Sequence, residues 1–159
     1  MKIDAQFKKV SYTQFAEYGD KQTYMDINLP KRATKLSAGY DFFAPSDMVL
    51  DAGQTVTAAT GIRAEMPDGF FLMIVPRSGL GFKYKLRLNN TVGIIDADYK
   101  DAPNEGHIFI RMTNESDKSL EIKKGEAFAQ GIFLQYCTTA DDSVTEQRSG
   151  GLGSTTKKI

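Results

Sequence analysis

The stretch FFLMIVP, residues 70–76, is a run of seven residues without a charge, bounded by a glycine on one side and a polar RSG on the other. A short continuous apolar run of this kind is typical of a strand that is buried on both faces. The stretch HIFIRMTN, residues 107–114, alternates instead, with Ile108, Ile110 and Met112 on one side of the chain. Alternation of this kind predicts a half-buried antiparallel strand. The two patterns together indicate a layered β protein.

Several further segments have the composition of short strands, and turn-rich stretches such as DAGQ, MPDG, DAPNEG and NESDKS separate them. These segments are residues 3–10, 47–50, 55–66, 86–95 and 127–139. Short strands at this spacing predict an all-β fold, a jelly-roll-like β-sandwich or distorted barrel of antiparallel strands. We expect at most one short helix, in TQFAEYG, with Thr13 as its N-cap and Gly19 as its stop signal.

Length and composition restrict the function classes. A chain of 159 residues is close to the usual size of one domain. Lys plus Arg and Asp plus Glu both number 20, so no basic surface announces binding to a nucleic-acid polymer. No secretory apolar segment leads the chain, and no run of 18 apolar residues could span a membrane. With a single cysteine, Cys137, in an apolar run that we expect in the core, the sequence predicts a soluble cytoplasmic protein.

Polar clusters interrupt the strand pattern at three places. SAGYDFF places Asp41 among aromatic residues, and VPRSGLG places Arg77 and Ser78 directly after the most apolar run. Arginine is a forked donor and glycine permits close backbone approach, so the second cluster could bind an anion, although many tight turns have the same composition. NNTVGIIDADYK ends an apolar strand in Asp96, which could activate a water molecule or lie in an ordinary solvated turn.

The stretch RSGGLGSTTKKI, residues 148–159, has almost nothing apolar to bury. It could be a solubilising terminus. Its glycines, hydroxyl groups and cations could equally wrap around phosphate oxygens. The only histidine, His107, stands at the start of a predicted strand, and we interpret it as a structural or surface residue rather than a proton carrier.

Five motifs occur in order along most of the chain: AGYDF, PRSGL, NNTVGIIDADY, GEAFAQGIF and RSGGLGST. Together they resemble the five motifs of the trimeric deoxyuridine triphosphatase (dUTPase) family, over about residues 29–158. The resemblance implies a single β domain over residues 1–147, followed by a flexible arm over residues 148–159. Residues 9–28 are expected to be a variable insertion, of a kind that differs among phage-encoded members. We therefore expect a member of the phage or Gram-positive prophage type.

The resemblance implies hydrolysis of dUTP to dUMP and pyrophosphate by Mg²⁺-assisted attack of water on the α-phosphorus, which keeps uracil out of DNA. It implies that Asp96 activates the water and that Gln130 contacts the α-phosphate region. Asp41 is implied to support the water shell of Mg²⁺ and to pair with Arg77. The metal itself is expected to be held by phosphates and waters, with no direct protein ligand.

The resemblance also implies roles in substrate binding. Ser78 is expected to bond the phosphate chain, Asn90 to read uracil, and Tyr99 to pack under the deoxyribose. The full expected set is Arg77, Ser78, Gly79, Asn90, Gly93, Ile95, Tyr99, Arg148, Gly151, Leu152, Gly153, Ser154 and Thr155. Leu152 stands where the family usually has a phenylalanine that stacks on uracil, so stacking by the arm is not implied here.

Partners and alternatives follow from the same resemblance. It implies a homotrimer in which each active site takes motifs from three chains. A dCTP deaminase of the same fold is an alternative enzyme, although GIIDADY and PRSGL favour the triphosphatase. A phage regulatory protein that binds a repressor or host protein through the nucleotide-site surface is an alternative of another class, and residues 9–28 are where such a surface could lie. The interpretation we favour for residues 9–28 is a strand, a short helix and a loop packed on the sandwich.

Overall fold

The apolar run at residues 70–76 forms β7 (Phe70–Pro76) in a computed structural model that describes residues 2–151. β7 lies in a five-stranded sheet of order β2-β3-β12-β7-β9, in which all pairings are antiparallel. The other strands of this sheet are β2 (Lys31–Arg32), β3 (Tyr40–Phe43), β9 (Gly93–Asp96) and β12 (Ala127–Gln135).

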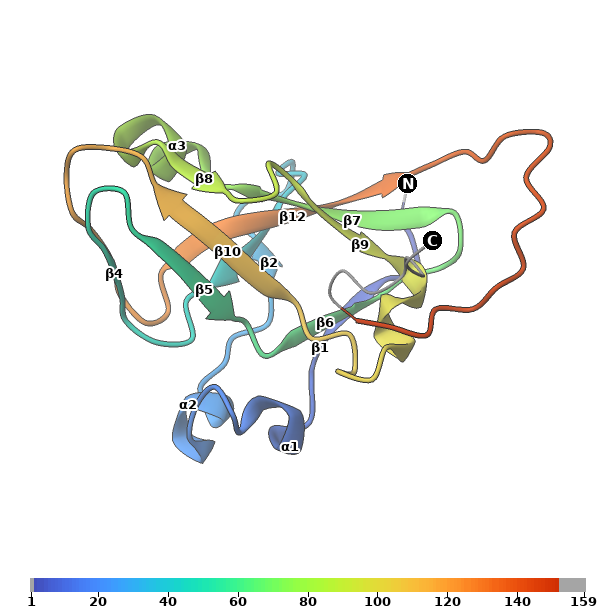
Figure 1. The fold of residues 1–159 in the computed structure, drawn as a ribbon, viewed down its shortest axis with the longest axis horizontal. Helices are drawn as coiled ribbons and strands as arrows, with labels where there is room; N and C mark the ends of the chain where they lie inside the picture. The colour runs from blue at the N-terminus through green and yellow to red at the C-terminus, as the bar shows by residue number, and fades with distance from the viewer. Residues whose placement is uncertain (1, 152–159) are drawn as a thin grey trace, which may run out of the picture.

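Smaller antiparallel sheets complete the sandwich (Figure 1), with the orders β5-β10-β8, β1-β6 and β11-β4. Their strands are β1 (Gln6–Lys9), β4 (Met48–Leu50), β5 (Thr55–Ala59), β6 (Ile62–Glu65), β8 (Leu86–Leu88), β10 (Phe109–Asn114) and β11 (Leu120–Ile122). The predicted all-β, jelly-roll-like architecture is confirmed.

The core fills the space between these sheets. Leu72 and Ile74 of β7 and Ile110 and Met112 of β10 are each at most 2% exposed. The alternation predicted for β10 is therefore confirmed, because Arg111 between them is exposed. β7 differs from the prediction, since the residues that alternate with Leu72 and Ile74 are only half-buried in the single chain.

Three predicted strands are shorter than the apolar pattern suggests. Residues 55–66 form two strands, because the chain turns at Gly61, whose φ is +68°. Residues 86–95 form two strands of different sheets, β8 and β9, because the chain turns near Thr91, whose φ is +66°. β12 ends at Gln135, so Cys137 beyond it is exposed, and its predicted burial in the core is wrong.

The prediction of at most one short helix is wrong. α1 (Tyr12–Phe15) begins two residues earlier than expected, because Ser11 rather than Thr13 caps it by accepting from the Gln14 N–H. α2 (Lys21–Met25), α3 (Ser78–Tyr84) and the 3₁₀ helix η1 (Ala97–Asp101) were not predicted. Each spans two turns or fewer, a length at which packing outweighs sequence periodicity.

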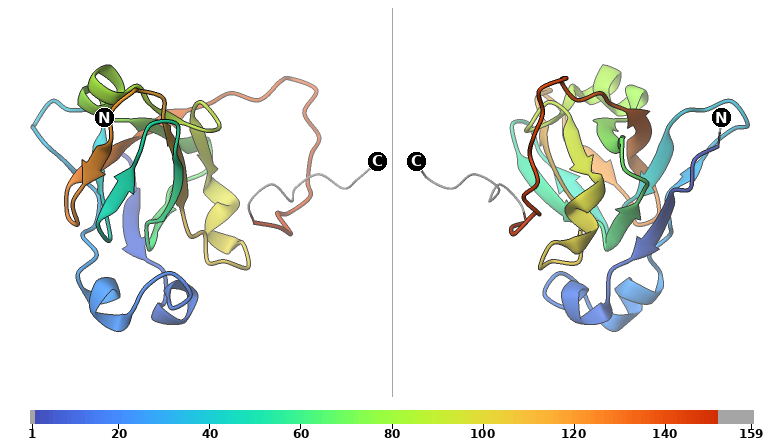
Figure 2. Two further views of the ribbon diagram at one scale, coloured as in Figure 1. Left: turned by 60° about the vertical axis from the view of Figure 1, so that its left-hand side comes forward. Right: turned by 90° about the vertical axis from the view of Figure 1, so that its right-hand side faces the viewer.

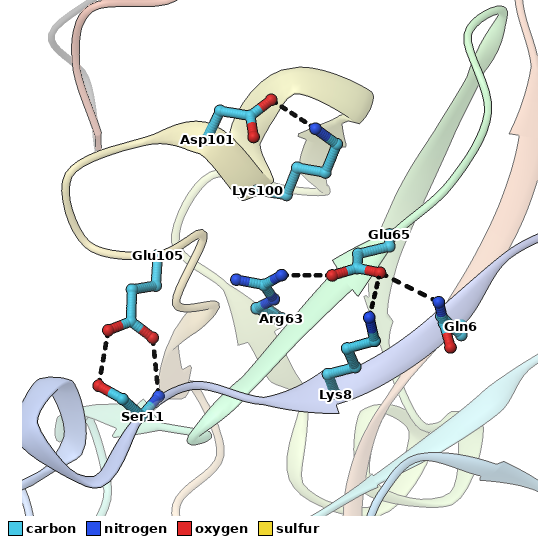
Figure 3. Close-up of polar contacts among 8 residues, drawn as sticks. All are labelled: Gln6, Lys8, Ser11, Arg63, Glu65, Lys100, Asp101 and Glu105. Atoms are coloured by element: carbon cyan, nitrogen blue, oxygen red, sulfur yellow. Dashed lines mark hydrogen bonds and ion pairs between the residues drawn. The ribbon is translucent and has the colours of Figure 1, made fainter.

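Residues 9–28 pack on one end of the sandwich, as predicted, but they contain two short helices, α1 and α2, where one was expected (Figure 2). Phe15 of α1 is 1% exposed, and the Tyr24 hydroxyl donates to the Val10 carbonyl. Preceding them, β1 is held on β6 by Glu65, which pairs with Lys8 at 2.7 Å and also with Arg63 (Figure 3). These hydrogen bonds hold the pKa of Glu65 at about 2, first through Lys8.

After β12 the chain from residue 136 to 147 is exposed and runs away from the sandwich before it returns beside η1 (Figures 1 and 2). Within residues 2–151, no helix has both the length and the apolar character needed to cross a membrane.

Candidate functional site

A first polar group lies where β3, β12 and β7 come side by side. Gln130 of β12 is in register with Asp41 of β3 on one side and with Val75 of β7 on the other. Arg77 follows β7 directly, and its Nε lies 3.2 Å from Asp41 Oδ1. The predicted Asp41–Arg77 pair is thus confirmed, and the Gln130 Nε2 donates across the same edge to the Pro76 carbonyl at 3.3 Å.

The room for Gln130 depends on Gly39. A Cβ built on Gly39 would lie 2.2 Å from the Gln130 Oε1, a distance at which atoms overlap. The glycine therefore lets the amide lie flat against the start of β3.

A cavity of about 720 Å³ opens beside this group, at the turn from β7 into α3. Arg77, Ser78, Gly79 and Lys83 line it on one side. Glu121 and Glu126 line the other. The cavity thus gathers the hydroxyl, backbone and guanidinium donors that phosphate oxygens accept from.

A second cavity, of about 400 Å³, lies at the turn between β8 and β9. Three residues predicted to bind substrate line it: Asn90, Gly93 and Ile95. Apolar side chains such as Ile74 and Phe109 form much of the remaining wall. Asn89 lines it beside Asn90, and a mostly apolar hollow with a few such polar groups has the character of a pocket for a planar polar ring.

A second polar group lies at the other end of β9, and it includes the described part of the arm. Arg148 contacts Asp96 Oδ2 with its Nη2 at 2.5 Å and Asp98 Oδ1 with its Nε at 2.8 Å. Its guanidinium carbon lies 5.6 Å from the centre of the Tyr99 ring. The arm of this chain thus covers the predicted water-activating aspartate and the predicted sugar platform of the same chain.

Tyr99 is 6% exposed and bonded on the inner side of η1. Its hydroxyl donates to the His107 carbonyl at 3.0 Å and accepts from the Asn104 amide at 2.8 Å. Burial is the main reason that the pKa of Tyr99 lies above its ordinary value. Asn104 was missed by the sequence reasoning, because it lies in the turn-rich DAPNEG, where no pattern distinguishes it.

His107 is fully buried, which confirms its structural interpretation. Its Nε2 accepts from the Gly61 N–H at 2.9 Å, so the ring is neutral and carries its proton on Nδ1. Burial lowers its pKa to about 4.

The two polar groups lie at opposite ends of β7. Asp96 is in register with Phe71, whereas Arg77 comes after Pro76 at the other end. Six residues of extended strand span about 20 Å. One chain therefore does not bring Asp96 and Arg77 to a single phosphate group.

The remaining predicted residues concern the arm. Gly151 lies beside Asn104, since a Cβ there would be 3.7 Å from the Asn104 amide nitrogen. Leu152, Gly153, Ser154 and Thr155 lie outside the described residues.

The donor chemistry near Arg77 suits magnesium held mainly by phosphates. Asp41 supplies a carboxylate of the kind that Mg²⁺ binds, often through water. Within residues 2–151, no three His, Cys, Asp or Glu side chains gather into a protein cage for a metal.

By its sandwich and by the chemistry at these two edges, the chain falls in the class of jelly-roll nucleotide hydrolases. Residues 25–156 match the family model for dUTPase. A deoxyuridine 5'-triphosphate nucleotidohydrolase of Lactococcus lactis is 42% identical over 132 residues, which are 81% of this chain and 88% of that protein. The chain therefore belongs to the dUTPase family.

Solved structures agree. The crystal structure of a dUTPase from Streptococcus mutans has a TM-score of 0.68 and 36% identity, and the match covers 84% of this chain and 97% of that one. A mutant dUTPase from phage phi11 of S. aureus, described with a coordinated structural Mg(II) ion, shares the fold at 21% identity. Its TM-score is 0.66, over 91% of this chain and 99% of that one.

Proposed function

We propose that this protein hydrolyses dUTP to dUMP and pyrophosphate, through active sites that form between copies of the chain. The observation that carries the proposal is the placement of the predicted base pocket, carboxylate and phosphate donors at the two ends of β7. Membership of the dUTPase family identifies the substrate, and the residues at these two ends of β7 account for the steps of the reaction.

Asp96 takes the proton of the attacking water. Its carboxylate lies at the end of β9 beside the buried Tyr99, so its position is set by the strand and by η1. The water oxygen bonds to the α-phosphorus, and the bond from that phosphorus to the pyrophosphate oxygen breaks. A general base acts only within hydrogen-bond reach of the water that it deprotonates.

Arg77, Ser78 and Gln130 bind the phosphate chain. Charge grows on the leaving pyrophosphate during the reaction, and fixed donors in a sheltered cavity stabilise it. The Asp41 carboxylate holds the Arg77 guanidinium in place. The arm adds further donors to the phosphates through the hydroxyl groups of Ser154 and Thr155. Glycines without side chains let the backbone approach the phosphates closely, and these are Gly79, Gly151 and Gly153.

The distance of about 20 Å along β7 supports sites shared between chains. A water at Asp96 must be within a few ångströms of the phosphorus that Ser78 and Arg77 also approach, so these residues must come from different copies. The outer face of the five-stranded sheet suits contacts between chains, because an apolar row crosses it. Ile94 of β9 is 51% exposed and pairs with Met73 of β7, which in turn pairs with Ile132 of β12. We propose a homotrimer, in which the arm of one chain covers the site of another. In the single chain, Arg148 rests on its own Asp96.

Magnesium, when bound with the triphosphate, neutralises charge on the phosphate oxygens. Asp41 would hold its water shell, and no other protein group is assigned to it.

We assign the uracil ring to the 400 Å³ cavity at the turn between β8 and β9. Its two carbonyls and one N–H match the Asn90 amide and the strand backbone near Gly93 and Ile95. Cytosine would leave buried groups wrongly paired, at about 1–3 kcal/mol each. The Leu152 side chain, in place of an aromatic ring, would cover the base without stacking on it.

Pyrophosphate release from dUTP, dCTP, dTTP and UTP tests the proposal, with Mg²⁺ and then with a chelator. Metal-dependent release from dUTP alone, lost in Asp96→Asn and strongly reduced in a chain truncated after Gln147, is expected. The Asp117→Asn variant, at an exposed turn, is the matched control and should behave as the wild type. Ammonia release from dCTP without pyrophosphate would identify a deaminase instead. A soluble trimer that releases no pyrophosphate from dUTP would refute the proposal.

Two further expectations attach to this function. A cytoplasmic location suits the exposed Cys137, since the single cysteine of the chain has no intrachain disulfide partner. Binding of a repressor or host protein stays a prediction for the surface of residues 9–28, where Tyr18 and Met25 are 47% and 61% exposed. Co-purification with such a partner, abolished by truncating the exposed side chains of α1 and α2 to alanine, would test it.

A further inference from the structure

The loop that follows η1, residues 102–107, forms hydrogen bonds with the Tyr99 hydroxyl. The Asn104 Nδ2 donates to the Tyr99 Oη at 2.8 Å, and that hydroxyl donates its own proton to the His107 carbonyl at 3.0 Å. One donor and one acceptor satisfy a phenol completely in the plane of its ring. A tilt of the side chain about its Cα–Cβ bond would carry the hydroxyl away from both partners at once.

The orientation of the Asn104 amide is fixed as well. Its Oδ1 accepts from the Gly106 N–H at 3.2 Å, which leaves the Nδ2 to face Tyr99. The Asn104 carbonyl accepts from the His107 N–H at 3.0 Å. The residue is therefore held at both its main chain and its side chain.

The N-terminal insertion anchors the same loop from outside. The Ser11 N–H and hydroxyl both donate to the Glu105 carboxylate, at 2.7 Å and 2.6 Å (Figure 3). The hydroxyl bond is the main reason that the pKa of Glu105 lies below its ordinary value. Because hydrogen bonds from Ser11 and His107 hold this loop, the position of Asn104 is fixed relative to Tyr99.

The opposite side of Tyr99 faces the arm. The Arg148 guanidinium lies over the ring, and Gly151 lies beside the Asn104 amide. Asn104 thus occupies the boundary between the Tyr99 hydroxyl and the described end of the arm.

We infer that Asn104 is a positioning residue for Tyr99, and that it sets how strongly the site prefers deoxyribose over ribose. The inference rests on the proposed function, in which the Tyr99 ring lies under the sugar. A ring held in one plane excludes a 2'-hydroxyl by contact, whereas a ring free to tilt gives way to it. Asn104 touches neither base nor phosphate in this scheme, so its effect falls on the choice of sugar.

The test compares kcat/KM for dUTP and for UTP in the full-length protein. Asn104→Ala removes the amide, and Asn104→Asp keeps the acceptor for the Gly106 N–H while removing the donor to Tyr99. Loss of one hydrogen bond should lower the dUTP-to-UTP ratio about three- to tenfold in both variants. Asn28→Ala, the same change at an exposed position, should leave the ratio as in the wild type.

A double-mutant cycle separates positioning from general damage. In a Tyr99→Phe background, which lacks the hydroxyl, Asn104→Ala should change the ratio no further. A merely structural role would lower the melting temperature and leave the ratio unchanged, and that result overturns the inference. An equal loss of the ratio with and without the Tyr99 hydroxyl also overturns it.

A readout without turnover keeps the inference independent of the proposed function. In protein labelled with ¹³C-tyrosine, the Tyr99 ring signal is identified by its absence from Tyr99→Phe. Asn104→Ala should broaden and shift the Tyr99 ring signals, because a side chain that tilts about its Cα–Cβ bond samples several environments. An unchanged Tyr99 signal overturns the inference, whereas absence of pyrophosphate release by the wild type refutes the proposed function alone.

Discussion

Lowering the pH below 6.5 should weaken this fold first through His107. The imidazole is fully buried between the sandwich and the N-terminal helices, with its centroid 4.2 Å from that of Phe109 and 5.4 Å from that of Tyr18. Its Nε2 accepts from the Gly61 N–H, and protonation would turn that acceptor into a second donor facing the first. The nearest opposite charge is Glu105, whose attraction is smaller than the cost of burial.

The magnitude follows from linkage. Burial lowers the pKa of His107 from 6.5 to about 4, so the unfolded chain binds more protons than the folded one between these values. The free energy of unfolding therefore falls as the pH drops below 6.5, and the contribution is fully lost near pH 4. At about 1.36 kcal/mol per pH unit this amounts to about 3 kcal/mol.

Two measurements check this reasoning. His107 is the only histidine of the chain, so the two imidazole nitrogen signals in ¹⁵N NMR of tag-free protein report its titration directly. We expect a midpoint near 4, with the proton on Nδ1 at neutral pH. Urea unfolding of wild type and His107→Gln at fixed protein concentration, from about pH 7.5 to about 4.5, should show their difference shrinking by about 2–3 kcal/mol. A midpoint near 6.5, or a difference that does not depend on pH, would refute the account.

Two glycine substitutions extend the predictions. Gly39→Ala should displace the Gln130 amide and lower kcat/KM for dUTP about tenfold while the melting temperature changes little, because the severe overlap is with the end of a side chain. The same change in a Gln130→Ala background should cost much less, since only the contact with the Cβ of residue 130, at 3.2 Å, is left. Gly106→Ala should lower the free energy of unfolding by more than about 1–3 kcal/mol in urea titrations, since its φ is +73° and its Cβ would lie 2.8 Å from the Lys100 Cα. Gly53→Ala, with a φ of +77° and no atom within 4 Å, should cost only the backbone strain, and equal losses at both positions would contradict the packing argument.

The strands were predictable because their signal is local. The apolar run of β7 and the alternation of β10 each lie within eight residues, and the structure keeps both. The helices were not predictable, because their sequences carry only a weak helical signal. α3 has the sequence SGLGFKY, whose two glycines are poor helix formers, and it ends at Lys85 in a left-handed conformation that usually favours glycine. Leu80 and Tyr84 pack against the core, and that packing, rather than propensity, holds the helix.

The site was predictable where the family motifs name a residue, and only there. The Asp41–Arg77 pair was implied by the motifs and is found. Asn104 and Glu105 escaped notice because a turn-rich segment does not reveal its partners: Glu105 bonds Ser11, which is 94 residues away. A turn-rich stretch such as DAPNEG predicts where the chain bends, and it contains no information about what the bend holds.

The placement of Asp96 and Arg77 at opposite ends of β7 has a genetic consequence. In the proposed shared site, a lesion at either residue would silence a pure assembly, yet each defective chain keeps the half that the other lacks. In the proposed homotrimers, assembled at random from equal amounts of both chains, about a quarter of the shared sites would unite an intact Asp96 with an intact Arg77. Two inactive alleles in one cell would therefore complement each other, and neither would act as a simple null.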